Sequence, residues 1–165
     1  MDLRTLGCLA AALCVACGSR TSNWNADGGS GSAAVLDSGA PGCIDLINHY
    51  RSMVGAPPVG RKVDEEECAA GQSADGVADW ADSGIAVFHR YFGACHEGAQ
   101  TQCWDTTGSA DDVLAACMAL FYAEGPPPDG GVNHYSIMTG TGYTTVACGS
   151  APLHDGGYWM TGDYY

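Results

Sequence analysis

The chain has 165 residues, with 19 Asp or Glu against 6 Lys or Arg, so its formal net charge is −13. No Lys or Arg follows Arg90. Binding to nucleic acid or to anionic lipid headgroups needs clustered cationic side chains, so the composition excludes the first and disfavours the second. The length suits one domain, and an apolar share of 46% is enough to build a core.

Residues 1–17 have the pattern of an export signal. One cation, Arg4, precedes an apolar run of 11 residues, Leu6–Ala16. That run is too short to span about 30 Å of hydrocarbon, so it indicates a signal peptide. It ends at Cys17, beside Ala16 and Gly18, and is similar to a bacterial lipoprotein processing site, which implies lipid on the Cys17 sulfur. The alternative is plain secretion. Either way we expect an extracytoplasmic protein of the cell envelope or beyond, in contact with a membrane only through a lipid anchor.

Residues 18–42 are rich in Gly, Ser, Asp and Ala, which predicts a flexible tether ahead of a folded domain at 43–165. Nine Cys in so short a chain favour an oxidising compartment. Six of them lie beyond the signal, and we expect them to form three disulfides: Cys43, Cys68, Cys95, Cys103, Cys117 and Cys148. The sequence leaves the pairing open, and the candidate local pair is Cys95 with Cys103, which bracket a short polar segment.

The spacing of apolar residues predicts three helices. The first covers about 43–54 and stops at the Gly-Ala-Pro-Pro of 55–58. The second starts after Asp64, as its cap, and ends near Gly84. Residues 85–92 are apolar around His89, and 93–108 are loop-like. The third helix starts at Ser109 with a capping box and ends before Gly125.

The C-terminal part is typical of strands. Residues 134–139 and 143–148 flank a Gly-Thr-Gly turn and predict a hairpin, and 158–165 predict a third strand. Helices first and strands last indicate an α+β fold in which helices cover a small antiparallel sheet.

No familiar catalytic motif is complete. His96-Glu97 begins like the helical zinc-protease motif, but Gln100 stands where its second His is needed. Imidazoles and carboxylates, which suit zinc and similar cations, remain as candidates: His89, His96, Glu97, Glu124, His134 and His154. Glu124 ends an otherwise apolar helix face, so it either has a partner or bends out to water.

Four segments carry a resemblance to a known family. In chain order they are Ile47-Asn48-His49-Tyr50-Arg51 with Gly55 and Pro57-Pro58, then Cys95-His96-Glu97-Gly98-Ala99, then Phe121-Tyr122-Ala123-Glu124, then His134-Tyr135-Ser136 with Val146-Ala147-Cys148-Gly149. Their order and spacing resemble the CAP superfamily, which comprises the cysteine-rich secretory, antigen 5 and pathogenesis-related 1 proteins and is also called the SCP domain. The resemblance runs from about Ile44 to Tyr165.

The resemblance implies a three-layer α-β-α sandwich with a central cleft lined by two His and two Glu. Carried over to this chain, these are His89, Glu97, Glu124 and His134, with His96 as a competitor for the place of His89. Such a cleft can bind a divalent cation, often zinc. Ile137 and Gly140 depart from the family pattern, as do His96 and Gly98 around Glu97, which implies that contacts beyond the four residues differ.

We therefore expect a non-enzymatic, exported CAP module that binds a divalent cation and either a partner protein or a small apolar ligand. Six aromatic residues are candidates for binding surface: Tyr135, Tyr143, Tyr158, Trp159, Tyr164 and Tyr165. One alternative is a metal-dependent, peptidase-like hydrolase in which His134 and Glu124 act as base and orienter. The other is a structural lipoprotein of the cell envelope with a vestigial cleft.

Overall fold

The structure is a computed structural model, and it describes residues 42–165. The predicted signal peptide, the lipidation site at Cys17 and nearly all of the predicted tether lie outside the described residues. Among the helices of the described part, none combines the length and the hydropathy needed to cross a bilayer.

The fold is α+β with a mixed four-stranded sheet. The strand order is β1-β3-β4-β2, where β1 pairs parallel with β3 and the other neighbours are antiparallel. The strands are β1 (Gly60–Arg61), β2 (Ala99–Asp105), β3 (Thr145–Pro152) and β4 (Tyr158–Tyr164). The helices are α1 (Cys43–Met53), the 3-10 turn η1 (Val63–Glu65), α2 (Glu66–Ser83), α3 (Ala110–Ala123) and α4 (His134–Thr139). The prediction of an antiparallel sheet therefore holds for β2, β3 and β4 and is wrong for β1.

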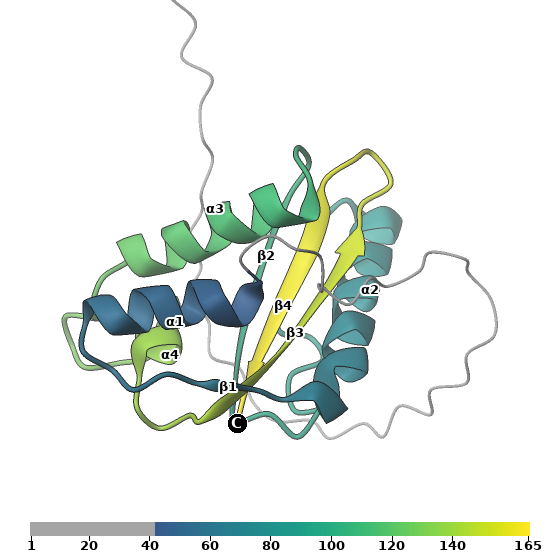
Figure 1. Cartoon of the computed structure of the whole chain (residues 1–165). Coiled ribbons are helices and arrows are strands. Elements are labelled where there is room, and N and C mark those ends of the chain that lie inside the picture. The colour runs from purple at the N-terminus through teal and green to yellow at the C-terminus, as the bar shows by residue number, and fades with distance from the viewer. Residues whose placement is uncertain (1–41) are drawn as a thin grey trace, which may run out of the picture.

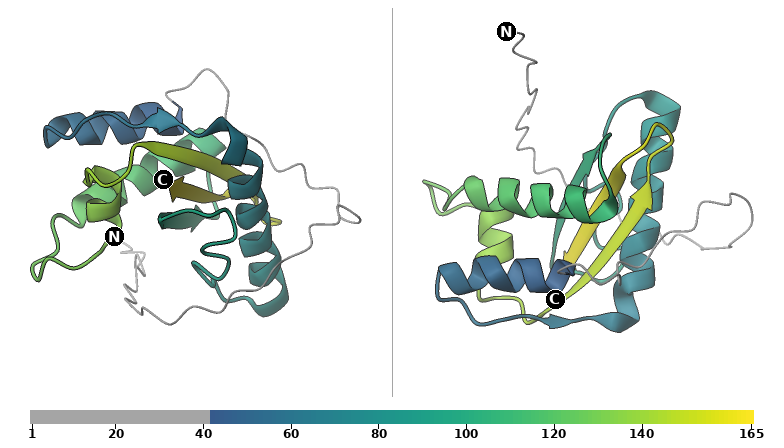
Figure 2. Two further views of the ribbon diagram at one scale, coloured as in Figure 1. Left: turned by 90° about the horizontal axis from the view of Figure 1, so that it is seen from below. Right: turned by 45° about the horizontal axis from the view of Figure 1, so that its top comes forward.

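Helices lie against both faces of the sheet. Helix α2 covers one face, and α1, α3 and α4 lie on the other side, as Figure 1 and the two views of Figure 2 agree. Alternation along β4 divides its side chains between them: Trp159 packs with Val77 of α2, whereas Met160 joins the core formed with α1 and α3. Helix α2 approaches β3 closely at Gly149, where a Cβ would lie 2.1 Å from the backbone nitrogen of Ala70.

Three disulfides connect the layers, which confirms the prediction of a fully paired set. Cys43 of α1 binds Cys148 of β3, and Cys103 of β2 binds Cys117 of α3. The third joins Cys68 of α2 to Cys95. The local pair Cys95–Cys103 is wrong, because residues 99–105 form a strand whose rise of about 3.3 Å per residue carries the two sulfurs apart.

The helix predictions from periodicity agree with α1, α2 and α3. The capping box of α3 is present, with Ser109 and Asp112 bonding reciprocally. Asp64 does not cap α2, since η1 precedes it and Glu65 occupies the cap position without a side-chain bond. Glu66, in the first turn, instead forms an ion pair with Arg61, in which the Glu66 side chain is buried and that of Arg61 is exposed.

Residues 134–139 are helix α4, so the predicted first strand and its Gly-Thr-Gly hairpin are wrong. Asn133 accepts from the backbone N–H of Ser136 and the Ser136 hydroxyl accepts from that of Asn133, so a complete capping box starts a helix there. The hairpin instead joins β3 to β4 through residues 153–157. Its turn has positive φ at Gly156 and Gly157, the conformation glycine favours.

Candidate functional site

The four residues implied by the resemblance lie around edge strand β2, two of them at helix ends and two in the connection between α2 and β2. Glu124 is the C-cap of α3 and His134 is the first residue of α4. His89 and Glu97 both belong to the connection between α2 and β2. The structure brings three of them together and connects the fourth, Glu97, only through another side chain.

Glu124 and His134 form the closest contact of the set. Oε1 of Glu124 lies 2.7 Å from Nδ1 of His134, and Oε2 accepts the backbone N–H of the same residue at 2.9 Å. The ring of His134 stacks on Phe121, with centroids 4.3 Å apart. Glu124 therefore takes a partner instead of bending out to water, and ring and main chain of His134 are held together.

His89 is the second imidazole of the site, and its ring centroid lies 6.2 Å from that of His134. Its backbone is left-handed, with φ 58°, which is uncommon outside glycine. Two residues of β2 hold it: Oε1 of Gln102 accepts its backbone N–H at 2.7 Å, and Oε1 of Gln100 lies 3.0 Å from its Nδ1.

The electrostatic surroundings of His89 favour the neutral ring. His89 is exposed as a residue, but protein atoms packed around its ring partly desolvate it, and this lowers the pKa of His89 below its usual value. The hydrogen bond to Gln100 opposes that shift, and the nearby His134 adds to it. A neutral imidazole is the form that binds a metal ion.

Glu97 is buried, and its hydrogen bonds go to groups other than the histidines. Its carboxylate accepts the backbone N–H groups of Gly93 and Cys95, at 2.7 and 3.0 Å, and the side-chain amide of Gln72 at 3.0 Å. In residues 42–165 no hydrogen bond joins Glu97 to His89 or His134. Its visible role is to close the turn that leads into β2.

A buried polar cluster beneath the histidines was missed by the sequence analysis. Gln100 and Asp163 lie opposite each other on β2 and β4, and Gln72 faces them from α2. Burial raises the pKa of Asp163 to about 7, against the hydrogen bond from Gln100, which lowers it. Alternation along β2, with Gln100 and Gln102 two residues apart, is the signal that points to this cluster.

One group of acidic and sulfur atoms in the described part is close enough to suggest a metal site, but it does not fit one. Ligand atoms of Cys95, Glu97 and Asp163 all lie within 4.8 Å of one another. The sulfur of Cys95 is bonded to Cys68, however, so it is not a thiolate. Two buried carboxyl groups remain, too few ligands for a closed cation site.

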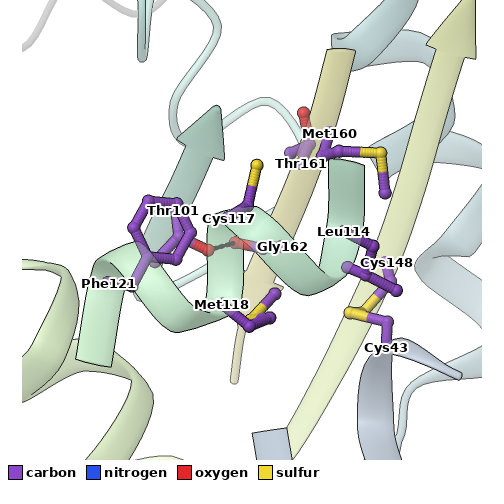
Figure 3. A pocket seen from close by; sticks show the side chains of 10 residues that line it. All are labelled: Cys43, Thr101, Leu114, Cys117, Met118, Phe121, Cys148, Met160, Thr161 and Gly162. Carbon is purple, nitrogen blue, oxygen red and sulfur yellow. Dashed lines mark hydrogen bonds between the residues drawn. A yellow bond between two sulfur atoms is a disulfide. The ribbon is translucent and has the colours of Figure 1, made fainter. Parts of the chain in front are cut away.

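No histidine lines the apolar cavity between α3 and the sheet, although Phe121 both lines it and stacks on His134. Figure 3 shows side chains of α3, including Leu114, Met118 and Phe121, facing Met160 and Gly162 of β4 across it. Its volume of about 10 Å³ is room for about one water molecule. A small apolar ligand therefore finds no space there.

The remaining candidates are peripheral. His96 and His154 are exposed and make no side-chain hydrogen bond within the described part of the chain. Of the aromatic residues predicted as binding surface, Trp159 and Tyr164 are fully buried in the core, so that prediction is wrong for both.

The comparisons with known proteins add no relative to this picture. The sequence matches no protein-family model, and no curated protein matches it significantly.

Proposed function

We propose that the protein is an exported CAP-type module that binds a divalent cation, with zinc as the first candidate, through His89 and His134. The observation that carries the proposal is the shared arrangement of the two rings. Nδ1 of each lies beside an oxygen, Glu124 Oε1 at 2.7 Å and Gln100 Oε1 at 3.0 Å. Metal-binding histidines typically engage their second nitrogen in this way.

The donor set suits a metal of zinc type. Imidazole nitrogens are ordinary zinc ligands, and neither Nε2 atom has a hydrogen-bond partner within residues 42–165. Glu124 orients His134, and Glu97 contacts the amide that faces His89. We therefore assign both carboxylates to supporting roles, which revises the expectation of four direct ligands.

The CAP assignment is supported by the order of the elements together with the positions of the motifs. Helices lie on both sides of the sheet, α3 ends at the Phe-Tyr-Ala-Glu segment and α4 begins at His-Tyr-Ser. The Val-Ala-Cys-Gly segment lies in β3, at the centre of the sheet. Two of the motifs, the segments that contain Glu124 and His134, therefore lie beside the imidazole pair.

The three disulfides fit a protein that folds in an oxidising compartment outside the cytoplasm. They also occupy every Cys of residues 42–165, so none of these is a thiol nucleophile. We propose a binding function without catalysis, in which water or a carboxylate of a partner protein completes the coordination left open by two histidines.

Equilibrium dialysis of the purified full chain against Zn²⁺ tests the proposal. We expect uptake by the wild type, loss of uptake in His134→Ala and wild-type uptake in His154→Ala, which removes an exposed histidine outside the site. Equal uptake by the wild type and His134→Ala would sink the site. If the protein hydrolysed a peptide or an ester, and this turnover required both the cation and Glu124, the result would contradict the binding function and support the hydrolase.

A further inference from the structure

The side chain of Gln100 stands between the buried polar cluster and His89. It is 3% exposed and occupies the second position of edge strand β2. Its Nε2 lies 2.7 Å from Oε1 of Gln72 and 2.9 Å from Oδ1 of Asp163. Its Oε1 lies 3.0 Å from Nδ1 of His89. The two ends of one amide therefore face opposite kinds of neighbour.

The orientation of that amide follows from its neighbours. The nitrogen of Gln72 faces two acceptors, the backbone carbonyl of Tyr91 at 3.1 Å and Glu97 at 3.0 Å. Its oxygen is thereby left to accept from Gln100. If the amide of Gln100 were flipped, its oxygen would face Oε1 of Gln72 with no hydrogen between the two oxygens, a costly arrangement in a buried site.

The polarity of this chain of hydrogen bonds extends to the imidazole. Because the oxygen of Gln100 is an acceptor only, the ring nitrogen beside it has to carry the hydrogen. The main chain of His89 is held separately, by Gln102, whose own nitrogen donates to Thr161 at 3.1 Å. Two glutamines of the same strand thus hold one histidine, one by its ring and the other by its backbone.

We infer that Gln100 is a positioning residue that fixes His89 as its Nδ1–H tautomer and so presents Nε2 as the free lone pair of the site. The consequence for cation binding rests on the proposed function, but the tautomer itself does not. Asp163 and Gln72 set the direction of the amide. The buried cluster thereby has a role in the site, which the contacts between the two imidazoles do not explain.

Long-range ¹H–¹⁵N NMR of the metal-free full chain, at a pH above the titration of His89, reads the tautomer directly. We expect a protonated Nδ1 and an unprotonated Nε2 in the wild type. Gln100→Leu, which keeps the approximate volume and removes the acceptor, is expected to shift the ring toward Nε2–H. Gln102→Leu is the matched control and should keep Nδ1–H, because it leaves the acceptor of the ring in place.

An Nε2–H ring in the wild type would overturn the inference, as would an unchanged Nδ1–H ring in a folded Gln100→Leu variant. The wild-type spectrum decides the tautomer even if that variant does not fold. A Zn²⁺ titration separates this result from the proposed function. We expect a 10- to 100-fold weaker affinity in Gln100→Leu, by analogy with other outer-shell substitutions. If neither the wild type nor any variant binds zinc while the tautomers are as expected, the proposed function is wrong and the inference about the tautomer stands.

Discussion

One carboxylate, that of Glu124, holds both the ring and the main chain of His134. Its two oxygens accept from Nδ1 at 2.7 Å and from the backbone N–H at 2.9 Å. The side chains are 32% and 30% exposed, so the pair is partly open to solvent, with Phe121 covering one face of the ring. The end of α3 and the start of α4 are thereby connected at the place where His134 turns toward His89.

Replacing Glu124 should therefore weaken cation binding more than stability. We expect Glu124→Gln to lower zinc affinity by about 10- to 100-fold, because the oriented acceptor of Nδ1–H is weakened. The free energy of unfolding should fall by only about 1 kcal/mol, as for one partly exposed hydrogen bond. Competition with a chromophoric chelator measures the affinity. Glu67→Gln removes the same charge from an exposed position of α2 and serves as control; equal affinities in the two variants would contradict the role of Glu124.

Asp163 should make the protein less stable as the pH rises. Burial raises its pKa to about 7, above the value of about 3.9 for an unfolded chain. Between these pH values the folded state binds more protons than the unfolded state, so the free energy of unfolding contributed by this group falls as the pH increases. The loss is at most about 4 kcal/mol. Asp163→Asn should remove it.

Urea unfolding at about pH 4 and about pH 8 measures this effect. We expect the difference between the two midpoints to shrink in Asp163→Asn, which keeps an acceptor for the amide of Gln100. A pH dependence identical to that of the wild type would show that Asp163 ionises normally in the folded protein.

Removing one disulfide should mainly lower stability, whereas removing another should mainly weaken zinc binding. Cys43–Cys148 closes a longer loop, with a sequence separation of 105, than Cys68–Cys95, with 27. Chain entropy thus predicts a larger loss of stability for Cys43→Ser/Cys148→Ser, by about 1 kcal/mol. Cys68→Ser/Cys95→Ser should weaken zinc binding more, because Cys95 lies in the connection that holds His89 and Glu97. Thermal unfolding measures the order of the two variants in stability, and dialysis measures their order in zinc binding. The reverse order in either measurement would contradict the prediction.

The close contact between α2 and the sheet should not tolerate a side chain. A Cβ at Gly149 would lie 2.1 Å from the backbone nitrogen of Ala70, so backbone has to move. We expect Gly149→Ala to lower the free energy of unfolding by roughly 2 kcal/mol or more. Gly142→Ala is the control, since no atom lies within 4 Å of its Cβ position. Equal stability of the two variants would mean that α2 packs differently.

The sequence is informative where local signals and packing agree. The apolar spacing and the Ser109–Asp112 box predict α3, and the aromatic run of 158–165 predicts β4. It misled at α4, where a period-two pattern over six residues competes with the cap at Asn133. The sequence did not predict strand β2, because its polar glutamines are typical of a loop. In the fold these glutamines are buried and bond to polar partners on other elements.

The candidate site also has a part that the sequence indicates and a part that it does not. A carboxylate at the end of an apolar helix face indicated that Glu124 either has a partner or bends out to water, and the structure shows the partner, His134. The cluster around Gln100 does not, because its members are 28 and 63 positions away, in Gln72 and Asp163. Only the register of β2 against β4 and the placement of α2 bring them together, and neither is encoded in local spacing.

Anomalous diffraction at the zinc edge, from crystals of the full chain grown with Zn²⁺, tests the central claim most directly. We expect one strong peak within bonding distance, about 2.0–2.1 Å, of Nε2 of both His89 and His134, with Glu124 and Gln100 still beside the Nδ1 atoms. A peak at Glu97 and Asp163, or none near the histidines, would contradict it.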